Sequence, residues 1–343
     1  MKKLELSYLP YEFKLKKTFV TSGISFNSRK GFIVSLTSEN GKSGVGDCAP
    51  FPEFGSETYE EAELALSKSE LHVKIDKLDP LNSIEESLKP LHHFPALRHG
   101  VEQALLSLVC SEMNMHLSEL LSVNPKDIVK VNAVLGMVSI DDAVDEVKSF
   151  LANGYSTVKV KTGRDNFEDD FNLIKKLREE FGKKISLRID SNGKWNVESA
   201  KVFLNRLEEF DIEYAEQPVA GNDEMSELNK FTKIPLAVDE SLRTNDDALD
   251  IIINGTADVL ILKPMMIGGL IPTLQIIDNA KRSGIKCVIS SSFESAVGRA
   301  FATFAAACIE DDVAHGLSVG EYFEEDIEQF ILPIRNGFIS LKR

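Results

Sequence analysis

The chain has 343 residues and a formal net charge of −15 at pH 7, from 39 Lys and Arg against 54 Asp and Glu. This negative balance would repel phosphate backbones and anionic membrane surfaces, which argues against nucleic acid as a partner. A composition of 43% apolar and 27% charged residues excludes a disordered or collagen-like chain. No segment approaches the roughly 20 apolar residues that span a bilayer. We therefore expect a cytoplasmic globular protein without membrane contact.

The first hundred residues have the texture of a small α+β domain. Residues 31–37 and 42–48 are strand-like runs joined by the polar turn 38–41, which predicts an antiparallel hairpin. Residues 57–69 show helical periodicity, and a longer helical pattern covers residues 98–121. This region is predicted to form an α+β unit distinct from the fold that follows it.

From about residue 131 a short apolar strand alternates with an amphipathic helix through most of the remaining chain. The strand candidates are residues 131–135, 156–161, 185–190, 212–216, 235–239, 258–263, 285–290 and, weakest, 313–316. Eight such units in about 190 residues predict a (β/α)8-type barrel. A doubly wound open sheet is the alternative, but residues 131–139 lack its GxGxxG turn.

The predicted architecture is thus an α/β fold with three parts. Residues 1–97 are expected to form an α+β capping domain, and residues 98–317 a (β/α)8-type barrel that carries the catalytic site. Residues 318–343 contain two strand-like runs and are expected to pack back on the capping domain and complete it.

Polar residues end most of the predicted barrel strands, and the active site of such a barrel is built at those ends. The intervals from Lys161 to Asp190, Glu216, Asp239 and Lys263 run from 23 to 29 residues, one strand–helix unit per step. A solvated loop charge or a helix cap would explain any one of these residues. A set that keeps step with the strand period favours a site.

Asp190, Glu216 and Asp239 would converge from three successive strands as hard oxygen donors, and their mutual repulsion would be costly without a cation. Carboxylates without thiolate or imidazole favour Mg²⁺ over zinc or copper. The sequence therefore predicts a magnesium site formed by these three residues, in which Mn²⁺ can substitute.

Lys159 and Lys161 are two residues apart on one predicted strand, so both point into the barrel. Lys263 would lie on the opposite side of the metal. Burial and neighbouring positive charge lower the pKa of a lysine, and a value of roughly 7 to 8 would make one of them a general base. A metal ion bound by a substrate carboxylate stabilises the dianion formed when the adjacent carbon loses its proton. The predicted reaction class is proton abstraction α to the carboxylate of a small molecule.

These residues resemble the enolase superfamily and, within it, the o-succinylbenzoate synthases. Lys159 and Lys161 resemble the family's KxK on the second strand, and Lys263 in ILKPMMIGG resembles its sixth-strand lysine. The family's metal ligands are similar to Asp190 in RIDSNGKW, Glu216 in AEQP and Asp239 in VDES.

Further segments resemble the synthases more specifically. The run SSSFES from Ser290 resembles their seventh-strand signature, and AHGL from Ala314 resembles their eighth-strand segment. Residues 18–25 and 49–52 resemble the loops that close over substrate. The side chains that this resemblance places against substrate are Ser290, Ser291, Ser292, Phe51 and Pro52. Gly268, which opens a helix with Gly269, either receives a substrate carboxylate on free N–H groups or forms a tight turn.

The resemblance implies the syn dehydration of 2-succinyl-6-hydroxy-2,4-cyclohexadiene-1-carboxylate to 2-succinylbenzoate, a step in menaquinone biosynthesis. Lys161 would take the α-proton and return it to the departing hydroxyl group. Lys263 would act electrostatically on the delocalised anion, and Lys159 would keep the pKa of Lys161 low. A homo-oligomer is compatible with the sequence.

Other functions use the same residues. In an N-succinylamino acid racemase or a dipeptide epimerase, Lys161 and Lys263 would act as paired acid and base on opposite faces. Residues 312–316 lack the DxD segment that dipeptide epimerases carry on the eighth strand. A Schiff-base lysine enzyme would leave the three carboxylates unexplained, and a non-catalytic binding barrel would leave the whole set unexplained.

Overall fold

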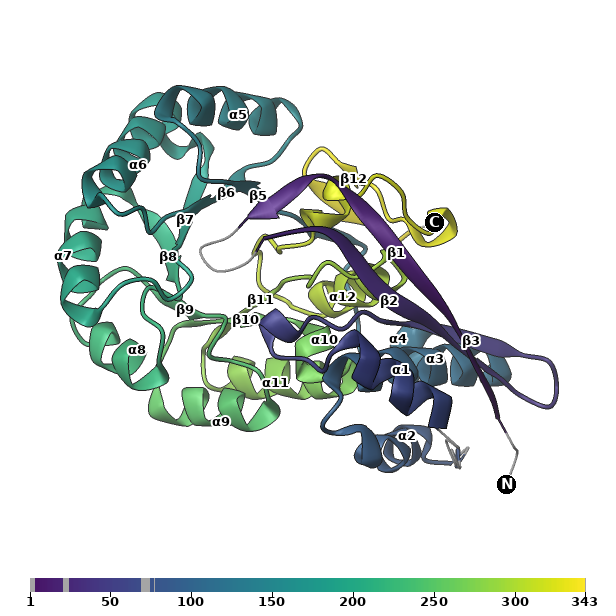
Figure 1. The fold of residues 1–343 in the computed structure, drawn as a ribbon. Helices are drawn as coiled ribbons and strands as arrows, with labels where there is room; N and C mark the ends of the chain where they lie inside the picture. The colour runs from purple at the N-terminus through teal and green to yellow at the C-terminus, as the bar shows by residue number, and fades with distance from the viewer. Residues whose placement is uncertain (1–3, 21–24, 69–74, 77, 343) are drawn as a thin grey trace.

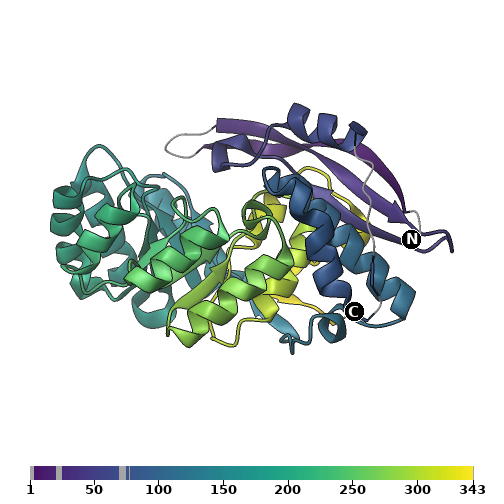
Figure 2. The ribbon, with the colours of Figure 1, turned by 90° about the horizontal axis from the view of Figure 1, so that it is seen from below.

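The computed structural model describes the whole chain except residues 1–3, 21–24, 69–74, 77 and 343. Near the N-terminus it forms an antiparallel sheet of three strands, β1 Glu5–Val20, β2 Ser25–Thr37 and β3 Ser43–Cys48, in that order. The predicted hairpin is confirmed, because β2 and β3 pair antiparallel from Thr37↔Ser43 to Phe32↔Cys48. Figure 2 shows this sheet as a layer along one face of the molecule.

Several helices, most of them short, connect this sheet to the rest of the molecule. They are η1 Pro52–Phe54, α1 Tyr59–Lys68, α2 Pro80–Leu88, η2 Lys89–Leu91, α3 Pro95–Met113 and α4 Leu117–Leu120. The single helix expected over residues 98–121 is wrong, because Asn114 adopts a left-handed conformation (φ 53°) and ends α3. The helix α3 lies directly on β3, where a Cβ at Gly44 or Gly46 would collide with its backbone.

A parallel sheet forms the centre of the molecule, in the order β5 to β11. Its strands are β5 Ala133–Leu135, β6 Thr157–Lys161, β7 Ser186–Asp190, β8 Ile212–Glu216, β9 Leu236–Val238, β10 Val259–Leu262 and β11 Lys286–Ile289. Figure 1 shows helices wrapped around the outside of this curved sheet. The helices and turns are α5 Ile140–Ala152, α6 Phe167–Phe181, η3 Gly182–Lys184, α7 Val197–Leu207, η4 Glu208–Phe210, α8 Asn222–Asn229, α9 Asn245–Asn254, α10 Pro264–Ile267, α11 Leu270–Arg282 and α12 Ala296–Ala307.

The prediction of a regular eight-stranded barrel is wrong at its eighth strand. Residues 313–316 form no ladder strand, and the sheet has seven strands without a continuous closing ladder. Only isolated bridges, Val131↔His315 and Ser290↔Gly316, join this segment to the two edges of the sheet. The His315 ring accepts the amide of Ile289 at 3.0 Å, so that a side chain takes a donor that a regular strand would pair with a carbonyl group.

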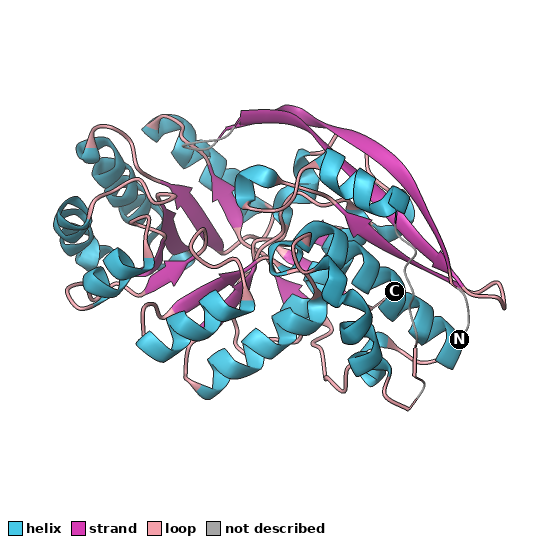
Figure 3. Ribbon diagram, turned by 60° about the horizontal axis from the view of Figure 1, so that its bottom comes forward, coloured by secondary structure: helices cyan, strands magenta, loops and turns pink. Residues whose placement is uncertain are grey.

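The C-terminal tail contacts both parts of the molecule. It contains η5 Ser318–Tyr322, η6 Glu328–Phe330, β12 Ile334–Arg335 and β13 Phe338–Ser340. Phe323 bridges Leu15 of β1, whereas β13 pairs with β4 Ile128–Lys130 beside the barrel. In Figure 3 the antiparallel sheet lies over helices on one side of the parallel sheet. No helix in the described part of the chain is long and apolar enough to cross a membrane.

Candidate active site

Strand β6 delivers two lysines to the interior of the curved sheet. Successive side chains of a strand point to opposite faces, and Val158 and Val160 are fully buried whereas Lys159 and Lys161 retain some exposure. Both lysines line a cavity of about 430 Å³ at the carboxyl ends of the parallel strands. The alternation of valine and lysine thus positions two ammonium groups on one side of the cavity.

The predicted carboxylates come from the strands that follow. Asp190 ends β7 and pairs in register with Lys161 of β6 and Glu216 of β8, while Asp239 follows β9 directly. Lys159 Nζ lies 3.0 Å from Asp190 and 2.8 Å from Glu216, and Lys161 Nζ lies 2.6 Å from Asp190. The register of the sheet therefore brings five of the predicted residues to one end of the strands.

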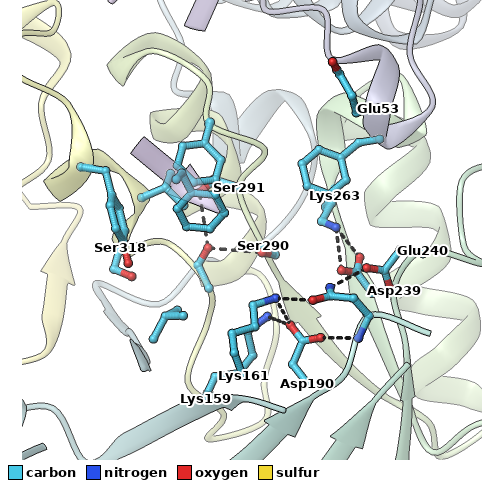
Figure 4. Close-up of a pocket in the computed structure, with 18 residues that line it drawn as sticks. Glu53, Lys159, Lys161, Asp190, Asp239, Glu240, Lys263, Ser290, Ser291 and Ser318 are labelled. Atoms are coloured by element: carbon cyan, nitrogen blue, oxygen red, sulfur yellow. Dashed lines mark hydrogen bonds and ion pairs between the residues drawn. The ribbon is translucent and has the colours of Figure 1, made fainter. Parts of the chain in front are cut away.

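Lys263 completes the set from a different strand. It follows β10 and places Nζ 2.5 and 2.7 Å from the two carboxylate oxygens of Asp239, and 4.6 Å from the ring centroid of Phe54. Figure 4 shows Lys161 with Asp190 and Lys263 with Asp239 as two separate pairs that reach into the same space. The cavity thus has an ammonium group from each of two non-adjacent strands.

Lys159 and Lys263 both have raised pKa values in the structure. Burial alone would lower the pKa of Lys159, but Asp190 and Glu216 hold it well above its ordinary value. Burial alone would also lower the pKa of Lys263, but Asp239 raises it above its ordinary value. A lowered lysine pKa was expected from burial and positive neighbours alone. In the structure each of these two lysines also faces a carboxylate, which raises its pKa.

The carboxylates respond unequally to this environment. Burial would raise the pKa of Asp190, but Lys159 and Lys161 hold it well below its ordinary value. Burial, followed by the charge of Asp190, raises the pKa of Glu216 to about 8. Glu216 Oε2 is buried without a hydrogen-bond partner. The site therefore holds one carboxylate whose negative charge its neighbours do not fully offset.

This geometry tests how well the residues fit a divalent cation. Among the residues described here, no group of three His, Cys, Asp or Glu side chains is arranged to hold a metal ion, because Lys159 stands between Asp190 and Glu216. Their chemistry nevertheless fits, since hard carboxylate oxygens come from successive strands and Glu216 Oε2 has no partner. To bind a metal ion, Asp190 and Glu216 would have to give up their contacts with Lys159.

The remaining walls of the cavity are serine hydroxyls and aromatic rings. Ser290 and Ser291, predicted to contact substrate, both line it. Phe293 adopts a left-handed conformation (φ 61°) that turns its ring toward Phe19 at a centroid distance of 4.7 Å. Strand β1 thus contributes Phe19 as part of the cover over the site. Residues 21–24 of the expected closing loop lie outside the described residues.

Three residues expected to contact substrate, two on the cap and one in the loop after β11, do not line the cavity. Phe51 is buried between Arg29 and Phe54 and does not line the cavity. Pro52 is exposed away from the cavity, and the lining residues from η1 are Glu53 and Phe54. Ser292 is buried behind the cavity wall, where its amide donates to Glu294. The cause is local. In a turn the direction of successive side chains changes within two residues, so the order of residues in the sequence does not reveal which of them faces the cavity.

Of the two roles that the sequence left open for Gly268, the structure shows the tight turn. Its amide donates to Pro264 at 3.0 Å, its carbonyl accepts from Arg98, and its φ of 91° marks a tight turn. The first amides of α11 are taken by Glu102 of α3, which accepts from Leu270 and Ile271. No N–H group is left there for a substrate carboxylate, and the turn interpretation holds.

Two polar cavity residues next to the predicted metal ligands, Asn192 and Glu240, were not among the predicted site residues. Lys161 Nζ donates to Asn192 Oδ1 at 2.9 Å, and Asn192 Nδ2 donates to Glu240 Oε1 at 2.7 Å. Asn192 lies two residues after Asp190 and adopts a left-handed conformation (φ 49°), which Asn tolerates well. The signal was present in RIDSN and VDE, where a polar residue follows each metal-ligand candidate.

Comparison with known families agrees with this geometry. Residues 142–343 match the model of the enolase C-terminal domain-like family, and residues 2–108 match the MenC N-terminal domain. The chain belongs to the enolase superfamily. Solved structures of similar fold include the dipeptide epimerase of Enterococcus faecalis V583, which is complexed with Mg and the dipeptide L-Leu-L-Tyr. That structure has a TM-score of 0.90 at 24% identity and covers 100% of this chain and 98% of its own.

Curated relatives in the superfamily catalyse different reactions. The L-Ala-D/L-Glu epimerase of Francisella tularensis subsp. novicida is 28% identical over 314 residues, covering 90% of this chain and 86% of the relative. The o-succinylbenzoate synthase of Thermobifida fusca is 33% identical over 222 residues, covering 64% of this chain and 68% of the relative. Identity at this level places the chain in the superfamily without deciding between these reactions.

Proposed function

We propose that the protein is a Mg²⁺-dependent o-succinylbenzoate synthase that dehydrates 2-succinyl-6-hydroxy-2,4-cyclohexadiene-1-carboxylate to 2-succinylbenzoate. The observation that carries the proposal is the composition of the cavity wall beside the eighth segment. Gly316, Ser318 and Val319 line it there, with no carboxylate among them. A dipeptide substrate would bring an ammonium group that needs such a partner, whereas a succinyl arm needs none.

The chain's own side chains account for the bond changes. Lys161, as the neutral amine, takes the proton from the carbon that bears the ring carboxylate, and the anion expels the hydroxyl group from the neighbouring carbon. The resulting ammonium group protonates that hydroxyl on the same face, so that water leaves, the ring becomes aromatic and Lys161 is neutral again. No oxidant or reductant is needed.

Other residues hold charge around this proton transfer. Lys263 faces the delocalised anion from another strand, and Asn192 Oδ1 fixes the direction of the Lys161 amine at 2.9 Å. Asp190, Glu216 and Asp239 are the residues that would hold Mg²⁺. When bound, Mg²⁺ supplies positive charge that stabilises the anion and offsets the carboxylate charge facing the lysines.

A second candidate is 1,1-proton transfer on an N-succinylamino acid. The observation that favours it is that Lys161 and Lys263 reach the cavity from different strands, as paired acid and base require. A dipeptide epimerase of solved structure has a similar fold.

One pair of assays separates the two candidates. Purified protein with Mg²⁺ should convert the cyclohexadiene substrate to the aromatic product, followed by absorbance, and chelation should stop turnover until Mg²⁺ is restored. An N-succinyl-L-amino acid in heavy water should show slower α-deuteration by NMR. Absence of aromatisation together with rapid deuteration would replace the synthase proposal by the racemase.

A further inference from the structure

A second cavity lies beside the active-site cavity, where a regular barrel would hold its eighth helix. After residues 314–316 the chain forms η5 and an irregular tail, and a cavity of about 600 Å³ lies between this tail, β5 and α5. Its lining combines apolar side chains such as Phe150 and Ile334 with polar groups such as Asn153 and Arg335. This volume falls within the range of small-molecule sites.

Three residues separate the two cavities. Val134 of β5 and Ser318 and Tyr322 of η5 line both of them. The Tyr322 ring lies edge-on to Phe19 at a centroid distance of 5.5 Å and tilted to Phe293 at 6.0 Å. Tyr322 therefore belongs to the aromatic cover of the active site on one side and faces the second cavity on the other. In Figure 4, Ser318 marks this wall, across the cavity from Lys263.

The backbone that carries this wall is fastened on both sides. Tyr155 donates its hydroxyl to Glu321 Oε2 at 3.1 Å, and Lys16 of β1 donates to the Glu321 carbonyl at 2.9 Å. Because these bonds hold η5 in place, the backbone should not move in when the Tyr322 ring is removed. Loss of the ring would therefore leave an empty space. The Tyr322 ring, together with Val134 and Ser318, closes the active-site cavity toward the second cavity.

We propose that Tyr322 is a specificity-determining residue that limits the length of the carboxyacyl arm of the substrate, and that the second cavity is the subsite beyond it. The inference rests on the proposed function, because the arm is defined relative to a carboxylate held at the lysines. An arm with more methylene groups than succinyl would need the volume that the ring occupies. Its polar end would then reach the polar groups near Asn153 and Arg335.

The test uses 2-succinylbenzoate and homologues with two or four more methylene groups in the arm. Their Kd values are measured by calorimetry on the full-length protein with Mg²⁺. The wild type and Tyr322→Phe should bind 2-succinylbenzoate most tightly, and Tyr322→Ala should prefer the longer ligands. The expected gain is about fourfold in Kd for each methylene group that the second cavity buries.

A filled-cavity variant shows where the longer arm goes. Ser149 lines only the second cavity, so Tyr322→Ala combined with Ser149→Phe should lose the gain for long arms and keep the Tyr322→Ala affinity for 2-succinylbenzoate. Equal weakening of all ligands by Tyr322→Ala, or a gain that survives Ser149→Phe, would overturn the proposal. Thermal melting of each variant confirms that it is folded.

Failure of the proposed function has a different signature. If the wild type does not bind 2-succinylbenzoate, the same arm series is attached to an N-acylated amino acid, the ligand of the second candidate function. In that series, too, Tyr322→Ala should bind the longer arms more tightly than the shorter one. If it prefers the longer arms in neither series, Tyr322 does not limit the length of the arm.

Discussion

At the scale of single residues, Lys161 and Lys263 distinguish the two candidate functions most sharply. Arginine keeps the positive charge of lysine but does not act as a base near neutral pH. Lys161→Arg should therefore lower kcat by on the order of 10²- to 10⁴-fold, whereas Lys263→Arg, which preserves an electrostatic role, should lose much less. Steady-state aromatisation kinetics measure both. Equal losses in the two variants would indicate paired acid–base chemistry, as in the racemase.

Glu216 provides a residue-scale test of the metal site. Its Oε2 is buried without a partner and its pKa is raised to about 8, first by burial and then by the charge of Asp190. Glu216→Gln should weaken Mg²⁺ binding by at least tenfold in calorimetry, because it removes one charged ligand. The matched control is Asp258→Asn, which changes a carboxylate that accepts the amide of Leu236, the first residue of strand β9. Equal Mg²⁺ affinity in the wild type and Glu216→Gln would exclude Glu216 as a ligand.

At the scale of elements, Glu102 joins two helices at a fully buried position. It lies on α3 and accepts the amides of Leu270 and Ile271 at the start of α11. Burial raises its pKa to about 8, against about 4.3 for an exposed glutamate. Between these values the folded protein holds a proton that the unfolded chain releases. The free energy of unfolding should therefore fall as the pH rises from about 5 to 8.

The variant Glu102→Gln tests this contribution. Its amide oxygen can still accept from Leu270 but does not titrate, so the loss of stability between pH 5 and 8 should shrink by on the order of a few kcal/mol. Urea unfolding at the two pH values measures the change. Glu85→Gln, at the more exposed partner of the same Arg98, is the control and should keep the wild-type slope. An unchanged slope in Glu102→Gln would show that Glu102 is ionised in the folded protein.

At the scale of the whole molecule, Asp47 joins the antiparallel sheet to the barrel. This fully buried residue of β3 accepts from the Ser295 amide at 2.7 Å, at the start of α12, and from the Tyr11 hydroxyl at 2.8 Å. Ser295 follows directly on the loop that carries Ser290 and Ser291. A shift of the sheet would therefore reach the serine wall of the cavity.

Replacement of Asp47 should show this connection in two measurements. Asp47→Ala leaves a buried amide and a buried hydroxyl without an acceptor, which should lower the free energy of unfolding by about 2–4 kcal/mol. Tyr11→Phe removes only one of these bonds and should cost about 1 kcal/mol. In steady-state assays Asp47→Ala should also raise KM for substrate. A stable Asp47→Ala variant with an unchanged KM would show that the two parts are held together elsewhere.

Strand periodicity explains why so much of the architecture was predictable. The alternation of Val and Lys in β6 and the hydroxyl–carboxylate spacing at Ser139 and Thr244 are local patterns. In the structure the side chains of Ser139 and Thr244 accept from the backbone amides of Asp142 and Asp247, three residues further along the chain. Local patterns of this kind depend on backbone geometry within a few residues, so they can be recognised without knowledge of the fold.

The sequence by itself determined the central strands, the helices between them and the residues that end each strand. Only the tertiary structure decided how those residues pair. It placed Lys159 between Asp190 and Glu216, reduced the eighth strand to isolated bridges, and used Glu102 to cap the helix after Gly268. The physical reason is range, because strand periodicity acts over neighbouring residues whereas ion pairs and caps join residues far apart in the chain, whose approach depends on the packing of every element between them.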